Sequence, residues 1–109
     1  MTIAPSPVFM TNATLPSAAG VRERGEVMLA RQNLRVARLI VPANAPVKTH
    51  RSPDDVVIVV VRGYGMINVD GTLRRVKTGD AIDVRPGAPH AVSAHEEMEL
   101  VVVHSRLAG

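Results

Sequence analysis

Short apolar runs separated by turn-forming residues characterise the chain from about residue 26 onward. The runs are rich in valine, and Gly, Pro, Asn and Asp stand between them, with no capped helical pattern longer than about ten residues. This pattern predicts an all-β domain. Many short strands of this kind are typical of a sandwich or barrel. The expected strands cover residues 26–31, 34–41, 47–51, 55–62, 65–69, 72–77, 81–84, 90–95 and 98–104.

The dipeptide Asp70-Gly71 stands between two of the expected strands, 65–69 and 72–77. Both residues of a tight type I′ turn need a positive φ angle, and Asp-Gly supplies it at little steric cost. The sequence therefore predicts a β-hairpin centred on this dipeptide.

The run from Val56 to Val61 has six consecutive apolar residues and so lacks the polar alternation of a strand with one solvated face. Such a strand needs a cover on its outer side. Either the N-terminal arm or a second subunit could provide it, and we expect a two-fold homodimer.

Residues 1–20 give little periodic apolar signal, because Pro5, Pro7 and Pro16 lie among small polar residues. We interpret this stretch as an extended arm and residues 21–109 as a single β-barrel domain. The arm could cover the 56–61 strand, exchange between subunits or be disordered.

Composition narrows the class of protein. The chain has no cysteine, so a metal would need imidazole and oxygen ligands, and a cytoplasmic location is expected. Neither a basic signal-peptide region nor an apolar run of the roughly 20 residues that a membrane helix needs is present in the sequence. The net charge of +3 comes from scattered basic residues, and Phe9 and Tyr64 are the only aromatic residues. We therefore expect neither nucleic-acid nor membrane binding.

Two stretches carry a resemblance to a known family. Residues 50–63 hold His50, Ser52, Val56 and Gly63 at the spacing of the first cupin motif, and residues 79–90 resemble the second motif through Gly79-Asp80, Pro86, Gly87 and His90. The chain thus resembles a small single-domain cupin of the cupin 2 type. The resemblance implies a jelly-roll barrel, also called a double-stranded β-helix.

In cupins, four motif positions usually converge on one divalent metal. Carried over to this sequence, these positions are His50, Ser52, Val56 and His90. Ser52 replaces a histidine and Val56 replaces a carboxylate or glutamine, while Ala94 stands where an asparagine often follows the last histidine. The resemblance therefore implies a degenerate metal site in which His50 and His90 remain.

Two other residues are candidates to replace the lost ligands. Asp54 shares strand parity with Val56, and His104 continues the parity of Met98, Leu100 and Val102. With the two motif histidines, either could hold Fe, Mn, Ni or Zn. In the competing interpretation, Asp54 pins a turn and His104 reaches solvent at a strand end. His95, beside two glutamates, is assigned no chemistry.

A ligand in the barrel would meet several further side chains. Lys48 shares parity with His50 and Ser52 and could reach the barrel mouth, or extend to its rim. Tyr64 and Met66 share parity and could line one wall, or serve as plain packing residues. The expected ligand-binding set is His50, Ser52, His90, Lys48, Val56, Tyr64 and Met66.

Three functions fit these residues. The first is a barrel that binds a small molecule without a tightly bound metal. The second is a metal-dependent cupin enzyme of the dioxygenase, isomerase or lyase type, which uses His50 and His90 with a substitute third ligand. The third is a barrel filled by its own side chains that acts through oligomerisation. The resemblance indicates a scaffold and leaves the reaction open.

Overall fold

The computed structural model describes residues 12–14, 24–45 and 48–106. Within these ranges all secondary-structure elements are strands, and no helix long and apolar enough to cross a membrane is present there. The all-β expectation is confirmed. The strands are β1 (Asn12–Thr14), β2 (Arg24–Ala30), β3 (Leu34–Val41), β4 (Asp55–Val69), β5 (Thr72–Lys77), β6 (Ala81–Val84) and β7 (His90–Ser105).

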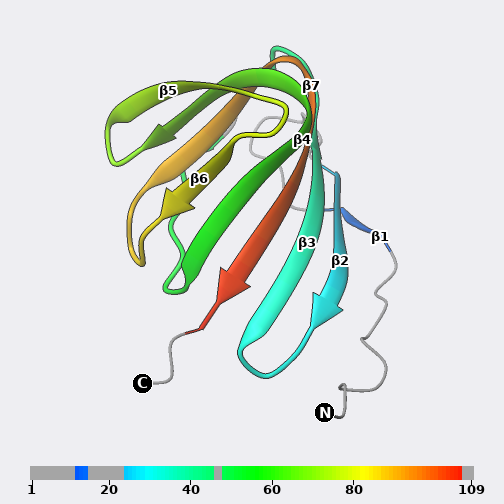
Figure 1. The fold of residues 1–109 in the computed structure, drawn as a ribbon, viewed down its shortest axis with the longest axis vertical. Helices are drawn as coiled ribbons and strands as arrows, with labels where there is room; N and C mark the ends of the chain where they lie inside the picture. The colour runs from blue at the N-terminus through cyan, green and yellow to red at the C-terminus, as the bar shows by residue number, and fades with distance from the viewer. Residues whose placement is uncertain (1–11, 15–23, 46–47, 107–109) are drawn as a thin grey trace.

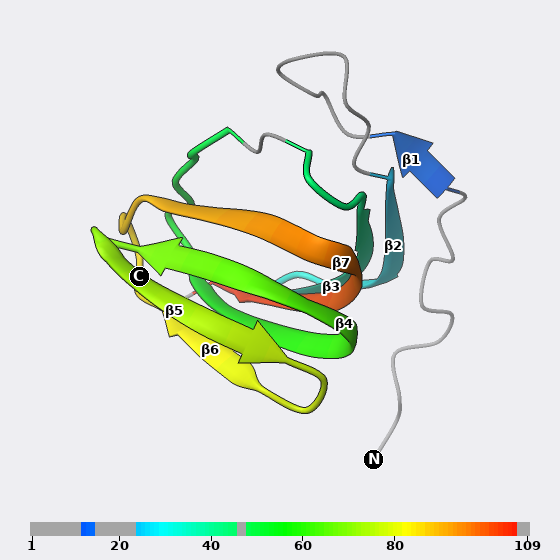
Figure 2. The same cartoon turned by 90° about the horizontal axis from the view of Figure 1, so that it is seen from above.

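The strands form one sheet in the order β1-β2-β3-β7-β4-β5, with β6 paired to β4, and every pairing between them is antiparallel. Figure 1 shows how this sheet curls into a partly closed barrel, and Figure 2 shows the same barrel from above. The two long strands β4 and β7 pair with each other from Asp55 to Val69 of β4. Both strands curve so that each contributes to two opposite sides of the barrel, its two walls (Figures 1 and 2). The ends of β7 therefore come to lie in different parts of the barrel.

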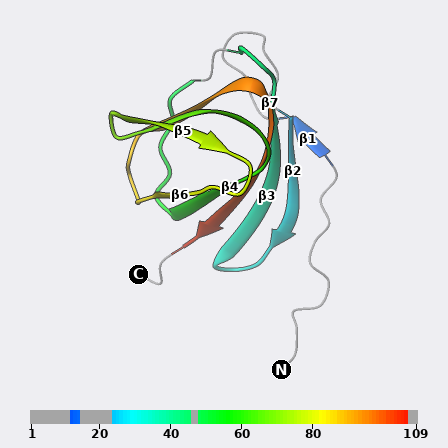
Figure 3. The same cartoon turned by 45° about the horizontal axis from the view of Figure 1, so that its top comes forward.

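A bend in the middle of β4 produces the curl. The pairing with β7 shifts register three times between Val60 and Gly65, which are β-bulges or irregularities of the ladder. Gly63 lies in this bend with φ of +86°, and a Cβ there would clash with the carbonyl oxygen of Glu97. Figure 3 shows β4 as one arc that passes from the side of β6 to the side of β5.

The bend explains two differences from the expected strands. Residues 55–62 and 65–69 belong to one strand, and so do residues 90–95 and 98–104, because the bulges bend the chain without ending its ladder. The expected hairpin is confirmed: β4 and β5 meet at Asp70 and Gly71, with φ of 52° and 86°.

The expected strand over residues 47–51 is wrong where the structure describes it. Lys48 and Thr49 lie outside any strand, and His50 forms one isolated bridge to His90. Two backbone hydrogen bonds of 3.0 Å make this bridge, one in each direction. The pairing stops there because the turn that begins at Ser52 leads directly into β4. Val47 and most of the expected arm lie outside the described residues.

The core fills the space between the two walls. Alternate residues of β4 and β7 point inward and are almost completely buried, because successive side chains of a strand point to opposite faces of the sheet. Full burial of one such side chain stabilises the fold by about 1.5–3 kcal/mol. The largest fully buried side chains are Val41, Val56, Val60, Ile67, Val84, Met98 and Leu100.

The outer face of β4 remains open to solvent in the single chain. Val57 and Val61 are 38% and 43% exposed. The expectation of a covering second subunit therefore stays a prediction.

Next to these valines, a row of alternating charges crosses the sheet. Arg38 pairs with Glu26 and Glu99 at 3.6 and 2.7 Å, and Arg62 pairs with Glu97 and Glu99 at 3.1 and 3.6 Å. The outer face of the sheet therefore carries exposed valines next to a row of ion-paired side chains.

Candidate functional site

His50 and His90 come together at one edge of the barrel. The backbone bridge between them places their ring centroids 4.4 Å apart, with the planes inclined at 68° in an edge-to-face arrangement. His90 is only 4% exposed, whereas His50 is exposed. The pairing of the two motif histidines, which the sequence predicted only through a resemblance, is therefore present as a direct contact.

Each ring is oriented by a backbone carbonyl two residues before it. Nδ1 of His50 lies 3.1 Å from the Lys48 carbonyl oxygen, and Nδ1 of His90 lies 3.0 Å from that of Ala88. Because a carbonyl oxygen can only accept a hydrogen bond, we assign the ring proton to Nδ1 in both histidines. The neutral form then has a lone pair on Nε2, and neither Nε2 has a hydrogen-bond partner among the described residues.

Burial favours the neutral form of His90. Desolvation lowers the pKa of His90 from its ordinary value of 6.5, and the nearby His50 lowers this pKa further. The hydrogen bond to the Ala88 carbonyl raises the pKa but does not reverse the shift. At neutral pH His90 is therefore an acceptor through Nε2 as well as a donor through Nδ1.

The other two motif positions have structural roles. The hydroxyl of Ser52 accepts a hydrogen bond of 3.1 Å from the backbone N–H of Asp54, and the Ser52 carbonyl accepts one of 2.8 Å from Gly87. Val56 is 1% exposed and belongs to the core. Ser52 thus holds the turn before β4, and Val56 supplies an apolar wall.

These residues do not complete a site for a divalent metal. A metal site of the ordinary open kind uses three protein ligands. Among the described residues, no three His, Asp or Glu side chains gather closely enough to hold one ion. The pair of imidazoles offers two nitrogen donors, and Val56, which takes the place of the motif carboxylate, is a hydrocarbon that stands opposite His104 in the β4–β7 ladder.

Asp54 and His104, the two substitute candidates, contact each other rather than the histidine pair. Nδ1 of His104 lies 3.6 Å from Oδ2 of Asp54, which is too long for a hydrogen bond, and Nε of Arg106 lies 3.6 Å from Oδ1. His104 Nδ1 is buried without a hydrogen-bond partner. His104 therefore does not reach solvent freely, and Asp54 both pins the turn through its backbone and faces other charges.

The pKa of His104 is lowered, mainly by burial and then by the charge of Arg35. The carboxylate of Asp54 opposes this shift, while His90 adds to it. The influence of His90 shows that the two histidines are within electrostatic reach of each other, although they belong to different clusters.

Three remaining candidates lie apart from the histidine pair. Lys48 is exposed, and its carbonyl rather than its ammonium group contacts His50. Tyr64 and Met66 share one face, as expected, but this is the outer face, because Gly65 and Ile67 are the buried residues beyond the bend. Each register shift in β4 can reverse which parity points inward, so counting from Val56 fails beyond Val60.

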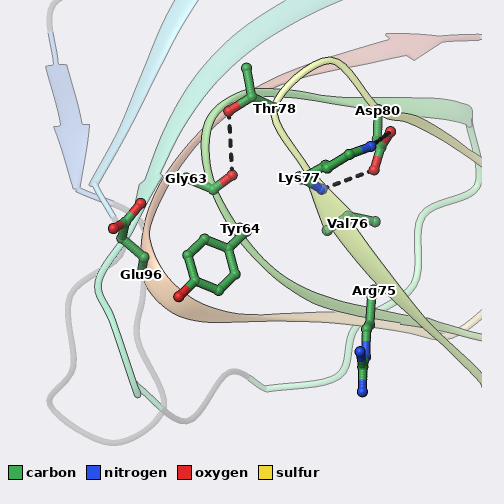
Figure 4. A pocket seen from close by; sticks show the side chains of 8 residues that line it. All are labelled: Gly63, Tyr64, Arg75, Val76, Lys77, Thr78, Asp80 and Glu96. Carbon is green, nitrogen blue, oxygen red and sulfur yellow. Dashed lines mark hydrogen bonds and ion pairs between the residues drawn. The ribbon is translucent and has the colours of Figure 1, made fainter.

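Tyr64 instead borders an open groove of about 660 Å³ on the outside of the barrel (Figure 4). Its ring is 44% exposed and packs on His95 at a centroid distance of 5.1 Å. Polar groups of the groove pair among themselves, as in the 3.6 Å ion pair of Lys77 with Asp80. The groove is lined by Gly63, Tyr64, Arg75, Val76, Lys77, Thr78, Asp80 and Glu96.

Sequence reasoning missed the backbone groups that orient the rings and the arginines around His104. The Lys48 and Ala88 carbonyls carry no side-chain signal. Arg35 and Arg106 come from two ends of the chain's barrel region and meet only through the pairing of β3 with β7. No local pattern in the sequence would have indicated either feature.

Comparisons with solved structures place the fold. The chain aligns with an RmlC-like cupin from Shewanella frigidimarina at 21% identity and a TM-score of 0.75, over 87% of this chain and 86% of that one. A predicted oxalate decarboxylase from Thermotoga maritima aligns at 19% identity and 0.74, over 90% and 94%. A salicylate 1,2-dioxygenase from Pseudoaminobacter salicylatoxidans aligns at 16% and 0.75, over 83% of this chain and 26% of that one. These likenesses show a shared barrel.

No curated protein sequence matches the chain. The sequence model of the family described as "Cupin domain" matches residues 37–104, which include both motif stretches and all strands from most of β3 to nearly the end of β7. Since this match covers more than half of the chain, the protein belongs to the cupin family.

Proposed function

We propose that this cupin binds a small molecule at the His50–His90 pair without requiring a tightly bound metal. The observation that carries the proposal is the orientation of the two rings, each with Nδ1 on a backbone carbonyl and Nε2 without a partner among the described residues. Two acceptor nitrogens on rings whose centroids are 4.4 Å apart suit a ligand that donates hydrogen bonds through hydroxyl or N–H groups.

The neighbouring residues define the rest of such a ligand. His90 stands opposite Val69 in the β4–β7 ladder, and Ala88 packs against the core. Val56, in the position where a carboxylate would favour a cation, is apolar. The ligand we propose is therefore a mainly apolar molecule with one or two donor groups. Small-molecule sites usually combine a largely apolar lining with a few polar groups that fix the orientation of the ligand.

A fragment screen tests this proposal. Histidine ring signals are followed by NMR in the presence of EDTA while neutral alcohols, phenols and amides are added together with their O- or N-methylated counterparts. We expect the donor-bearing fragments to shift the signals of His50 and His90, and the methylated ones to lose this effect. Fragments that shift these signals only after Fe, Mn, Ni or Zn is added, or a screen in which nothing shifts them, would contradict the proposal.

A metal-dependent cupin enzyme of the dioxygenase, isomerase or lyase type is the second candidate. The favouring observation is again the ring orientation, because metal-binding histidines commonly donate their other ring N–H to a backbone carbonyl. Structural neighbours of this chain include proteins described as a dioxygenase and as a predicted oxalate decarboxylase. This candidate needs a donor beyond His50 and His90.

The double variant Ser52→His/Val56→Glu separates the two candidates. It places a nitrogen donor and a carboxylate donor at the two motif positions that lack them. If the natural chain lacks a complete metal site, the double variant gains Zn affinity that the natural chain does not have. If the natural chain binds Zn as tightly as the double variant does, the metal-dependent enzyme is favoured.

A further inference from the structure

A second cavity is lined by residues of the β2–β3 hairpin and of the end of β7. Figure 1 shows these two segments at the lower edge of the barrel. The backbone N–H of Arg106 donates to the Asn33 carbonyl at 3.0 Å, and this bond ties the segment after β7 to the hairpin. Between them is a space of about 180 Å³. The cavity is lined by Ala30, Arg31, Gln32, Asn33, Leu34, Arg35, Asp54, His104 and Arg106.

The charges around this cavity are unbalanced. Three arginines line it against the single carboxylate of Asp54. Arg106 approaches Asp54 at 3.6 Å, whereas Arg31 and Arg35 have no acidic partner within ion-pair distance among the described residues. The positive charge of Arg35 helps to lower the pKa of His104, so Arg35 raises the electrostatic potential at this side chain of the cavity lining. A surplus of positive charge in a concave site attracts anions.

His104 provides a second and independent observation. Its Nδ1 atom is buried, has no hydrogen-bond partner and belongs to a side chain that lines the cavity. A buried polar atom without a partner is rare in folded proteins and calls for a group that satisfies it. The nearest acceptor, Oδ2 of Asp54, lies 3.6 Å away, which is ion-pair distance but longer than a well-formed hydrogen bond, so it satisfies this atom only weakly.

We propose that this cavity binds a small oxyanion through Arg35 and Arg106, with His104 as an additional hydrogen-bond donor. Guanidinium groups bind the paired oxygens of carboxylates and phosphates in a bidentate manner, so the chemistry fits either. At about 180 Å³ the cavity is smaller than the roughly 300–1,000 Å³ of ordinary ligand pockets, which limits the ligand to a phosphate or a short carboxylate. The site is separate from the one proposed at His50 and His90.

The test is a titration of the full chain with inorganic phosphate, followed through the ring signals of the four histidines. Sodium chloride at matched ionic strength serves as the reference, because exposed arginines attract any anion weakly. We expect phosphate to shift the His104 signals in a saturable way and to leave His50 and His95 unchanged. Phosphate that shifts His50 and His90 first, or that acts no differently from chloride, would overturn the proposal.

Two variants should change phosphate binding in opposite directions, and a third serves as the control. Arg35→Gln is expected to weaken phosphate binding by about tenfold or more, as the loss of a charged hydrogen bond implies. The matched control Arg74→Gln removes an exposed arginine of β5 and should change nothing. Asp54→Asn removes the competing carboxylate and should strengthen binding severalfold. Equal losses in Arg35→Gln and Arg74→Gln, or a loss in Asp54→Asn, would overturn the site.

A competition experiment extends the test to carboxylates. Malonate should displace phosphate and shift the same His104 signals, because both ligands offer paired oxygens to the arginines. Malonate that shifts a different set of signals would contradict a shared oxyanion site. If Arg35→Gln fails to fold, the titration of the natural chain and the expected gain in Asp54→Asn still decide the question.

Discussion

His90 and His104 occupy the two ends of β7 and both point toward the inside of the barrel, yet their surroundings differ. Backbone groups hold His90: a carbonyl orients its ring, and a bridge fixes His50 beside it. Charged side chains surround His104, with Asp54 on one side and Arg35 within reach on another. Burial lowers the pKa of both rings, so their difference lies in what each neutral ring can bind.

One strand can thus contribute to the two proposed sites in different ways. A ring whose N–H is satisfied by the backbone presents a lone pair to a ligand that donates hydrogen bonds. A ring with an unsatisfied nitrogen among arginines suits a ligand with oxygens that accept them. The first arrangement supports the proposed binding of a donor-bearing molecule, and the second supports the proposed oxyanion cavity.

Damage to the shared core should affect both ends of β7 at once. Leu100 is completely buried between them, and Leu100→Ala is expected to lower the free energy of unfolding by about 2–5 kcal/mol. Urea denaturation measures this loss. Leu73→Ala on exposed β5 is the control, since its side chain is 58% exposed and should matter little. Similar losses in the two variants would contradict the placement of the core.

Replacing each of the two histidines by alanine in turn should distinguish the two proposed sites. His90→Ala is expected to weaken binding of donor-bearing fragments by about tenfold or more and to spare phosphate binding, while His104→Ala does the reverse. NMR titration of both variants with both probes gives the four affinities. If either variant weakens both probes equally, the two ends of β7 form one site and the comparison fails.

The pH dependence of stability should report both rings. Because the pKa values of His90 and His104 are lower in the folded protein than the ordinary 6.5, the unfolded chain binds more protons below that pH. The contribution of these two histidines to the free energy of unfolding is therefore at its maximum above about pH 6.5, and it is lost as the pH falls below that value. Urea denaturation between about pH 5 and 8 measures this slope.

Single variants assign that slope to its sources. We expect His90→Gln and His104→Gln each to reduce it, and His95→Gln, on the exposed outer face, to leave it unchanged. A natural chain whose stability rises toward acidic pH would show that the charges around the rings, rather than burial, dominate their titration.

The smallest effect is expected on the outer face, where charges are paired but exposed. Arg62 is 52% exposed, and its ion pairs with Glu97 and Glu99 are screened by water and salt. Arg62→Gln should cost no more than about 1 kcal/mol in the free energy of unfolding. Thermal denaturation at low and high salt checks this value. A larger cost that persists at high salt would mean that the charge row stabilises the sheet as a unit.

Much of the fold followed from local patterns in the sequence. The Asp70-Gly71 turn and the β3, β5 and β6 ranges were correct because turn chemistry and valine-rich runs are local properties. The continuity of β4 and β7 was not, because whether a glycine such as Gly63 ends a strand or only bends it depends on what packs across from it.

The candidate site was predictable only in part, for a related reason. The motif spacing selected His50 and His90, but the side on which Tyr64 and Met66 lie depends on register shifts that the spacing does not reveal. Asp54 and His104 were each selected as candidates, yet their approach to one another arises from the pairing of β4 with β7 over about fifty residues of sequence.

Metal content is the most direct test of the central claim that the His50–His90 pair binds its ligand without a tightly bound metal. The protein would be purified without a polyhistidine tag and analysed for Fe, Mn, Ni and Zn, alongside His50→Ala and His90→Ala. We predict substoichiometric metal in all three proteins and no thermal stabilisation by added ions, which a saturating ligand would otherwise produce. One metal ion per natural chain, lost in both variants, would contradict the claim.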